Sequence, residues 1–112
     1  MEQYYEVLKT LSDESRFKII TILLKQDLCV GGLAKQLDIS KPAVSQHLQT
    51  LRKMGLVTGE KRGYFTHYIV NRALLTQVGE KLIEIASKQP DQGCLREKTG
   101  ECSCQCQCTS NK

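Results

Sequence analysis

The residues of this 112-residue chain best suited to chemistry are its six cysteines, five of which follow position 93. Four alternate with other residues in the run Cys102-Ser103-Cys104-Gln105-Cys106-Gln107-Cys108, and Cys94 precedes them. A disulfide framework that stabilises a core would distribute its cysteines along the chain. The clustering instead indicates reduced thiols available to a soft metal ion or to redox chemistry.

Thiols at every second residue of a flexible segment can wrap a soft ion. Three thiolates satisfy trivalent arsenic, trivalent antimony or lead, four satisfy zinc or cadmium, and two or three satisfy cuprous ion. Regular zinc sites have wider ligand spacing, so zinc selectivity is not indicated. The alternative is an unstructured segment whose thiols scavenge or oxidise without regulating anything. We favour a ligand set made of Cys94, Cys102, Cys104, Cys106 and Cys108.

Cys29 lies apart from the other cysteines, at the expected start of a helix. The helix dipole and the free amides of the first turn favour a thiolate there, which makes Cys29 a sixth candidate ligand. An ordinary half-buried residue at a weak cap position explains it equally well. His47 and His67 have no carboxylate or second histidine at helical spacing, so we interpret both as DNA-facing or structural. No Ser/His/Asp set, phosphate loop or carboxylate pair supports an enzyme.

Apolar residues at helical spacing predict the elements that position these groups. A short helix is expected over residues 2–10. Ser12 is the predicted N-cap of a second helix, whose apolar face includes Phe17, Ile20 and Leu24 and which ends near residue 26. A shorter helix over residues 31–37 and a tight turn over 38–40 follow. Ser40 caps the next helix, with Pro42 in its first turn, and Gly55 ends it.

From Leu56 the apolar period changes from helical to two. Strands are predicted over residues 56–58 and 64–70, with Lys61-Arg62-Gly63 as a basic turn between them. Asn71 caps a last helix, and the ordered part of the chain is expected to end at Pro90 and Gly93. The chain is thus divided into a folded domain, 1–89, and a flexible cysteine-rich tail, 90–112. The last helix has an apolar face broad enough to indicate burial against a second copy: Leu74, Leu75, Val78, Leu82 and Ile85.

The positive charge is concentrated in the middle of the chain. The net charge is +4, and residues 35–72 hold seven basic and two acidic residues, a net +5. A basic middle indicates a polyanionic partner, although a solvated lysine-rich face would give the same count.

Two helices joined by a tight turn and followed by a basic hairpin predict a winged helix-turn-helix, a mainly α fold with a small β-hairpin wing. The second helix would lie in the major groove, where Gln bonds adenine edges and Lys reaches guanine or phosphate. A helical hairpin with a solvated outer face is the alternative, and the basic hairpin argues against it. The predicted DNA-binding residues are Lys41, Pro42, Ala43, Ser45, Gln46, Gln49, Lys61 and Arg62.

The chain has no run of 18 apolar residues, so no transmembrane helix is expected. Its first residues lack a basic region followed by an apolar stretch, so no secretory signal is expected either. We therefore expect the protein to stay in the cytoplasm.

The order and spacing of five runs resemble the ArsR/SmtB family over about residues 4–86. The runs are LSDESR at 11–16, LCVGGLA at 28–34, ISKPAVSQHL at 39–48, LRKMGLV at 51–57 and RGYFTHY at 62–68. The resemblance implies a homodimeric cytoplasmic repressor that binds an operator near its own promoter. It also implies release from that operator when a metal or metalloid ion binds.

The usual sensing sites of the family are incomplete here. Its arsenic and cadmium sensors carry Cys-Val-Cys where this chain has Cys29-Val30-Gly31. Its zinc sensors use an Asp and His set on the last helix, where this chain has Asn71-Arg72-Ala73 and no later histidine. We therefore predict a repressor released by arsenite or antimonite that is bound by tail thiolates, with Cys29 as a further ligand. A repressor that senses oxidants or reactive sulfur, a metal buffer or chaperone, and a repressor without a ligand are the alternatives.

Overall fold

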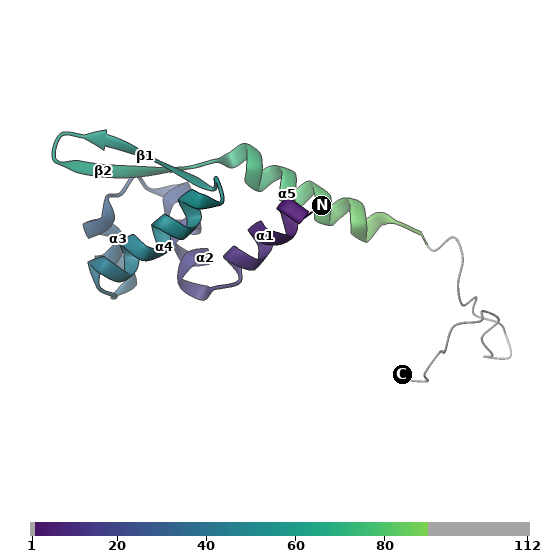
Figure 1. The fold of residues 1–112 in the computed structure, drawn as a ribbon, viewed down its shortest axis with the longest axis horizontal. Coiled ribbons are helices and arrows are strands. Elements are labelled where there is room, and N and C mark those ends of the chain that lie inside the picture. The colour runs from purple at the N-terminus through teal and green to yellow at the C-terminus, as the bar shows by residue number, and fades with distance from the viewer. Residues whose placement is uncertain (1, 90–112) are drawn as a thin grey trace, which may run out of the picture.

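The computed structural model describes residues 2–89, which form five helices and a two-stranded hairpin (Figure 1). Within this part of the chain, no helix is long and apolar enough to cross a bilayer. The five tail cysteines lie outside the described residues. The predicted boundary between a domain over 1–89 and a tail over 90–112 lies at their edge. The elements are α1 (Glu2–Leu11), α2 (Glu14–Lys25), α3 (Val30–Leu37), α4 (Lys41–Lys53), β1 (Val57–Arg62), β2 (Phe65–Val70) and α5 (Arg72–Ser87).

Helix α2 begins one residue later than the sequence predicts. Its N-cap is Asp13, whose Oδ2 accepts a hydrogen bond from the Arg16 amide at 3.0 Å. Ser12 is not the cap, because its hydroxyl donates to the carbonyl of Lys9 at the end of α1. The Arg16 amide is the main cause that holds the pKa of Asp13 below its usual value. Ser12 and Asp13 are both good capping residues and are adjacent in the chain. Ser12 bonds to the last turn of α1, so Asp13 caps α2.

The buried face of α2 is also rotated relative to the prediction. Phe17 is 54% exposed, whereas Ile19, Ile20 and Leu23 are buried. The expectation that Phe17 lies on the buried face is therefore wrong. Apolar residues occur on more than one side of this helix, so periodicity alone does not select the side that packs.

The predicted ends of α3, α4 and α5 agree with the structure. Ser40 Oγ accepts from the Ala43 amide at 3.2 Å at the start of α4, and Asn71 Oδ1 accepts from the Leu74 amide at 3.2 Å at the start of α5. Asp38 ends α3 in the left-handed region, with φ 58°. Gly55 follows α4 with φ +80°, a conformation that glycine adopts without strain.

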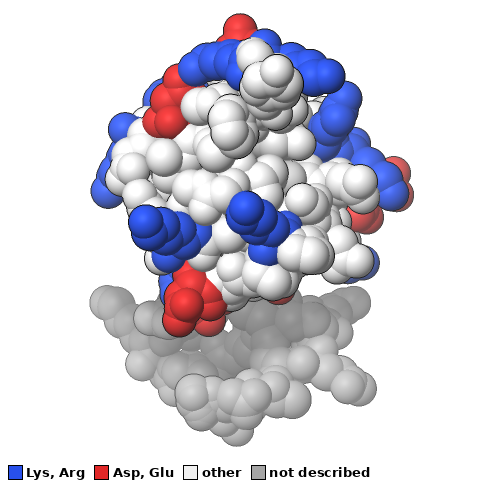
Figure 2. Space-filling model, turned by 90° about the vertical axis from the view of Figure 1, so that its left-hand side faces the viewer, with Lys and Arg blue, Asp and Glu red and all other residues white. Residues whose placement is uncertain are grey.

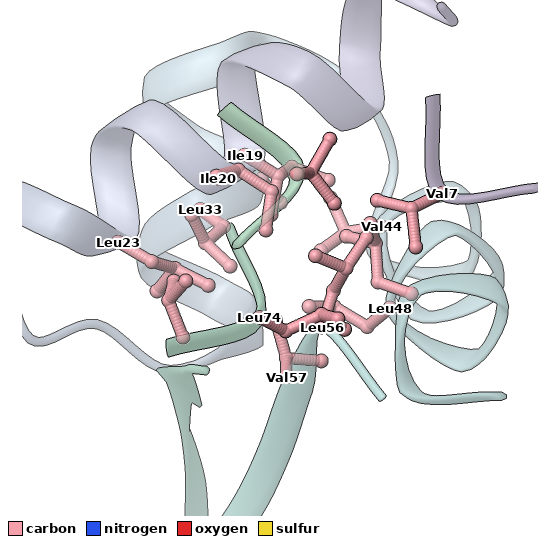
Figure 3. Packing of buried hydrophobic residues seen from close by; sticks show 14 residues of the cluster. Val7, Ile19, Ile20, Leu23, Leu33, Val44, Leu48, Leu56, Val57 and Leu74 are labelled. Atoms are coloured by element: carbon pink, nitrogen blue, oxygen red, sulfur yellow. The ribbon is translucent and has the colours of Figure 1, made fainter. Parts of the chain in front are cut away.

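The core is one cluster into which all five helices and both strands place side chains. Figure 3 shows these side chains converging between the helices and the base of the hairpin. Val44, Leu48 and Leu51 form the buried stripe of α4, as predicted, and each is at most 1% exposed. The opposite face of α4 is consequently directed away from the core.

The wing is longer than the sequence predicts. Strand β1 continues to Arg62 and pairs antiparallel with β2, from Val57 opposite Val70 to Arg62 opposite Phe65. The turn is therefore Gly63-Tyr64, and the predicted turn at residues 61–63 is wrong. The strongly β-forming residues of β2 pair with weak strand formers on β1, which local propensity misses. Gly63 has φ +64° at the first turn position, the pattern of a type II′ hairpin turn.

Candidate nucleic-acid interface

Helix α4 presents a polar face to solvent. Lys41, Pro42, Ser45, Gln46 and Gln49 are exposed, and Ala43 is half-buried. Positions three and four apart share a helix face, so these side chains lie together opposite the buried stripe. The structure thus exposes five of the six residues predicted on α4, and it leaves Ala43 half-buried.

The wing extends beyond the helices at the end of the molecule where α3 and α4 lie (Figure 1). Figure 2 views this end and shows Lys and Arg side chains gathered along its upper edge, with acidic side chains among them and below. Lys61 is exposed, and no ion pair joins it to another residue in the range 2–89. Because successive strand residues point to opposite faces, Lys61 and Arg62 lie on different sides of the wing.

The tip of the wing carries an aromatic residue that the sequence analysis did not single out. Tyr64 is 100% exposed and follows Gly63 in the turn, and Phe65 is 61% exposed. Placing the turn at Gly63-Tyr64 would have identified both. An exposed aromatic ring beside a basic side chain suits contact with sugars and bases of nucleic acid.

Arg62 is held by two carboxylates. Its Nη1 donates to Asp27 Oδ2, and its Nε and Nη2 donate to Glu60 Oε1 at 2.9 and 2.6 Å. Asp27, followed by Glu60, raises the pKa of Arg62, so the guanidinium is charged in this arrangement. The sequence placed Arg62 in the DNA-binding set without indicating these partners.

Asp27 is shared between two wing residues, since its Oδ1 also lies 2.8 Å from His67 Nδ1. The hydrogen bond from Arg62, followed by that from His67, lowers the pKa of Asp27. Because the folded state lowers this pKa, the ionised Asp27 stabilises the folded protein. This stabilisation is complete above the unfolded value of 3.8 and is lost as the pH falls through the folded pKa. The Asp27 carboxylate is therefore charged at neutral pH.

Both histidines have protein partners. His47 points from α4 toward the start of α2, where its Nδ1 lies 3.5 Å from Arg16 Nη1 and 4.0 Å from Asp13 Oδ2. His67 is half-buried and bonded to Asp27. The sequence predicts that His47 and His67 are each DNA-facing or structural. Their contacts with Arg16, Asp13 and Asp27 are those of structural residues.

Cys29 is the N-cap residue of α3, and it is half-buried. Its carbonyl accepts from the Leu33 amide at 3.0 Å, and its side chain makes no capping hydrogen bond. The thiol borders a cavity of about 300 Å³ that is also lined by Lys41 and by the wing residues Tyr64 and Phe65. No group of three or more His, Cys, Asp or Glu side chains able to hold a metal occurs within residues 2–89. Cys29 therefore belongs to no set of three such ligands in this part of the chain.

Sequence comparison places the helix-turn-helix in a known family. The family model for bacterial regulatory proteins of the arsR family matches residues 13–58, which span α2, α3 and α4. The arsenical resistance operon repressor of Staphylococcus xylosus is 33% identical over 96 residues, which cover 86% of this chain and 92% of that protein. This chain belongs to the ArsR family. The family consists of transcriptional regulators and not of enzymes. This confirms the predicted resemblance to the family and the prediction that the chain is not an enzyme.

Solved structures give the same assignment for the fold. An ArsR-like transcriptional regulator from Rhodococcus sp. RHA1 superposes with a TM-score of 0.69 at 32% identity, covering 77% of this chain and 81% of that one. The winged helix-turn-helix prediction is thereby confirmed. The names of other relatives state different roles. The cadmium resistance regulator CadC of Listeria innocua is 37% identical over 73 residues, covering 64% of this chain and 61% of that protein. The transcriptional activator HlyU of Vibrio cholerae is 38% identical over 65 residues, covering 58% and 60%.

Proposed function

We propose that this ArsR-family protein is a homodimeric repressor that binds operator DNA in the cytoplasm and is released when cysteine thiolates capture arsenite or antimonite. The exposed polar face of α4 beside a basic wing carries the DNA-binding part of this proposal. Helix α4 enters the major groove, and the wing reaches the neighbouring backbone. The proposed DNA-binding set stays as predicted: Lys41, Pro42, Ala43, Ser45, Gln46, Gln49, Lys61 and Arg62.

Base reading and phosphate contact are separable by two substitutions. Gln46→Ala should relax base preference by about 1–3 kcal/mol at one position of the operator. Lys61→Ala should weaken binding to all sequences and reduce the slope of log affinity against log salt by about one. Arg62→Ala should change the slope less, because Asp27 and Glu60 already compensate that charge. Fluorescence anisotropy with DNA from upstream of the gene and with a scrambled duplex, at several salt concentrations, measures each effect. An unchanged slope for Lys61→Ala would contradict this placement of the wing.

The dimer is proposed from an apolar groove between α1 and α5. The groove has a volume of about 250 Å³ and is lined by Tyr4, Tyr5, Leu8, Val78, Lys81, Leu82 and Ile85. Leu82 and Ile85 are each 46% exposed in the single chain, although both are large and apolar. A second copy would cover this surface and bring two α4 helices to successive turns of the duplex. The winged helix-turn-helix domain Mb0332 from Mycobacterium bovis, which shares this fold at 20% identity and a TM-score of 0.63, is homodimeric.

The proposed sensor is the cysteine tail. A trivalent metalloid takes three thiolates, and within residues 2–89 Cys29 stands alone. Cys94, Cys102, Cys104, Cys106 and Cys108 must then supply most or all of the ligands, with Cys29 as a further donor. Relatives of this chain include arsenical and cadmium resistance regulators, which supports a soft ion of this kind. Cadmium, lead, zinc and cuprous ion are the other candidates.

Release requires the ion to favour the form of the dimer that does not bind DNA. The ion and the operator are linked by a coupling free energy, so the ion loosens DNA only if it binds the free protein more tightly. Titrating the protein–operator complex with arsenite, antimonite, cadmium and lead, and separately with peroxide and polysulfide, tests the signal. Release by the oxidants alone would replace the metalloid sensor with a thiol-redox sensor.

A further inference from the structure

The connection between α2 and α3 is attached to the wing through Asp27. One oxygen of this carboxylate accepts from Arg62 near the turn of the hairpin, and the other accepts from His67 on the second strand. Two residues further along the connection, the backbone of Cys29 forms an isolated antiparallel bridge with the backbone of His67. The segment 27–29 thus contacts both strands of the wing.

The rest of the wing has little else to hold it against the body. Its base is anchored in the core by Val57 and Val70, which are 1% and 7% exposed, and the half-buried Tyr68 of β2 also packs against the core. Beyond the base, residues 58–62 of β1 are all exposed, and so are the turn and Phe65. A two-stranded hairpin is marginally stable alone. The orientation of the distal half therefore depends on its few contacts with segment 27–29.

We propose that Asp27 is a positioning residue for DNA recognition, acting through Arg62 and His67 to set the wing relative to the recognition helix α4. This inference rests on the proposed DNA binding and adds a residue outside the helix and the hairpin that contact DNA. Asp27 is not expected to touch DNA, because a carboxylate near phosphate would be repelled. Its contribution is to the discrimination of the operator from other DNA, since discrimination requires α4 and the wing to fit the duplex together.

Glu60 provides a matched control. Like Asp27, it is an exposed carboxylate bound to the Arg62 guanidinium, and its replacement by glutamine adds the same unit of positive charge. Unlike Asp27, it belongs to β1, so its bond with Arg62 lies within the wing and cannot tie the wing to the body. Asp27→Asn and Glu60→Gln therefore change the net charge equally, but only Asp27→Asn removes a contact between the wing and the body.

Hydrogen exchange of the free full-length protein measures the attachment directly. Asp27→Asn should speed exchange of the backbone amides at the distal end of the wing, over residues 59–67, and leave α4 and the core unchanged. Glu60→Gln should leave the exchange of the wing close to that of the wild type. Equal exchange in all three proteins would overturn the proposal whether or not the protein binds the operator.

Binding to operator and scrambled DNA then tests the consequence. Asp27→Asn should lose about tenfold in operator affinity, the size expected for one charge-assisted contact, without losing affinity for scrambled DNA. Asp27→Glu retains the carboxylate and should recover part of the loss. Glu60→Gln should bind both DNAs at least as tightly as the wild type. If both neutral variants instead tighten operator binding equally, Asp27 acts only through its charge and the proposal is wrong. If the wild type itself does not prefer the operator, the proposed function fails, while the exchange result still decides the attachment.

Discussion

Leu82→Glu should turn the dimer into a monomer and remove operator binding with it. Leu82 lines the apolar groove between α1 and α5, where the proposed partner packs. A carboxylate buried there without a partner costs several kcal/mol, counted twice in a symmetric dimer. In the single chain Leu82 is 46% exposed, so the substitution should leave the monomer folded. Sedimentation velocity measures the mass, circular dichroism confirms the helices, and a gel shift reports the loss of binding.

Ile83→Glu is the matched control for this experiment. Ile83 is the next residue of α5, is 67% exposed and does not line the groove. The same change of charge at this position should leave both the dimer and operator binding intact. A Leu82→Glu protein that sediments as a dimer would place the interface elsewhere. Monomers of both variants would mean that added charge on α5, rather than the groove, is responsible.

The features that the sequence predicts correctly are local ones. Ser40 and Asn71 cap their helices because a short oxygen-bearing side chain precedes an apolar period, and the partner amide lies three residues away. The polar face of α4 follows from the buried stripe on the opposite side. These signals lie within one or two helical turns, so α4 and its outward residues could be identified before the structure.

The features that the sequence misses depend on residues distant in the chain. Arg62 is 35 residues from Asp27, and His67 is 40 residues from it, so no local pattern connects them. The extent of β1 is likewise decided by β2, which pairs with residues of weak strand propensity. Whether Arg62 faces DNA or a carboxylate therefore becomes visible only when the connection between α2 and α3 is placed beside the wing.

A chain ending at Gln92 should still fold and bind the operator, but it should no longer be released by arsenite. Among the described residues the last buried one is Val78 and α5 ends at Ser87, so the cut leaves all of the described core in place. It does remove all the cysteines except Cys29, whereas a trivalent metalloid takes three thiolates. Cys29→Ser in the full chain should give a weaker defect, because the five tail thiols can replace one lost ligand. Operator binding titrated with arsenite, antimonite, cadmium and lead measures both variants.

Gly31→Cys in the shortened chain tests whether that chain binds arsenite weakly because it has too few thiols. A Cβ at position 31 would lie 3.9 Å from Cys29 Sγ, and its nearest neighbour would be Lys41 Cε at 3.7 Å, an ordinary contact. The substitution therefore places two thiols side by side, as in the arsenic and cadmium sensors that the sequence resembles. Arsenite binding, measured by calorimetry, should be stronger in this variant than in the shortened chain with Gly31, because two thiolates replace one. If the shortened chain with Gly31 is instead fully released by any of the ions, the tail is not the sensor. The sensing site must then be sought within residues 1–92, where Cys29 of the two subunits supplies two thiols.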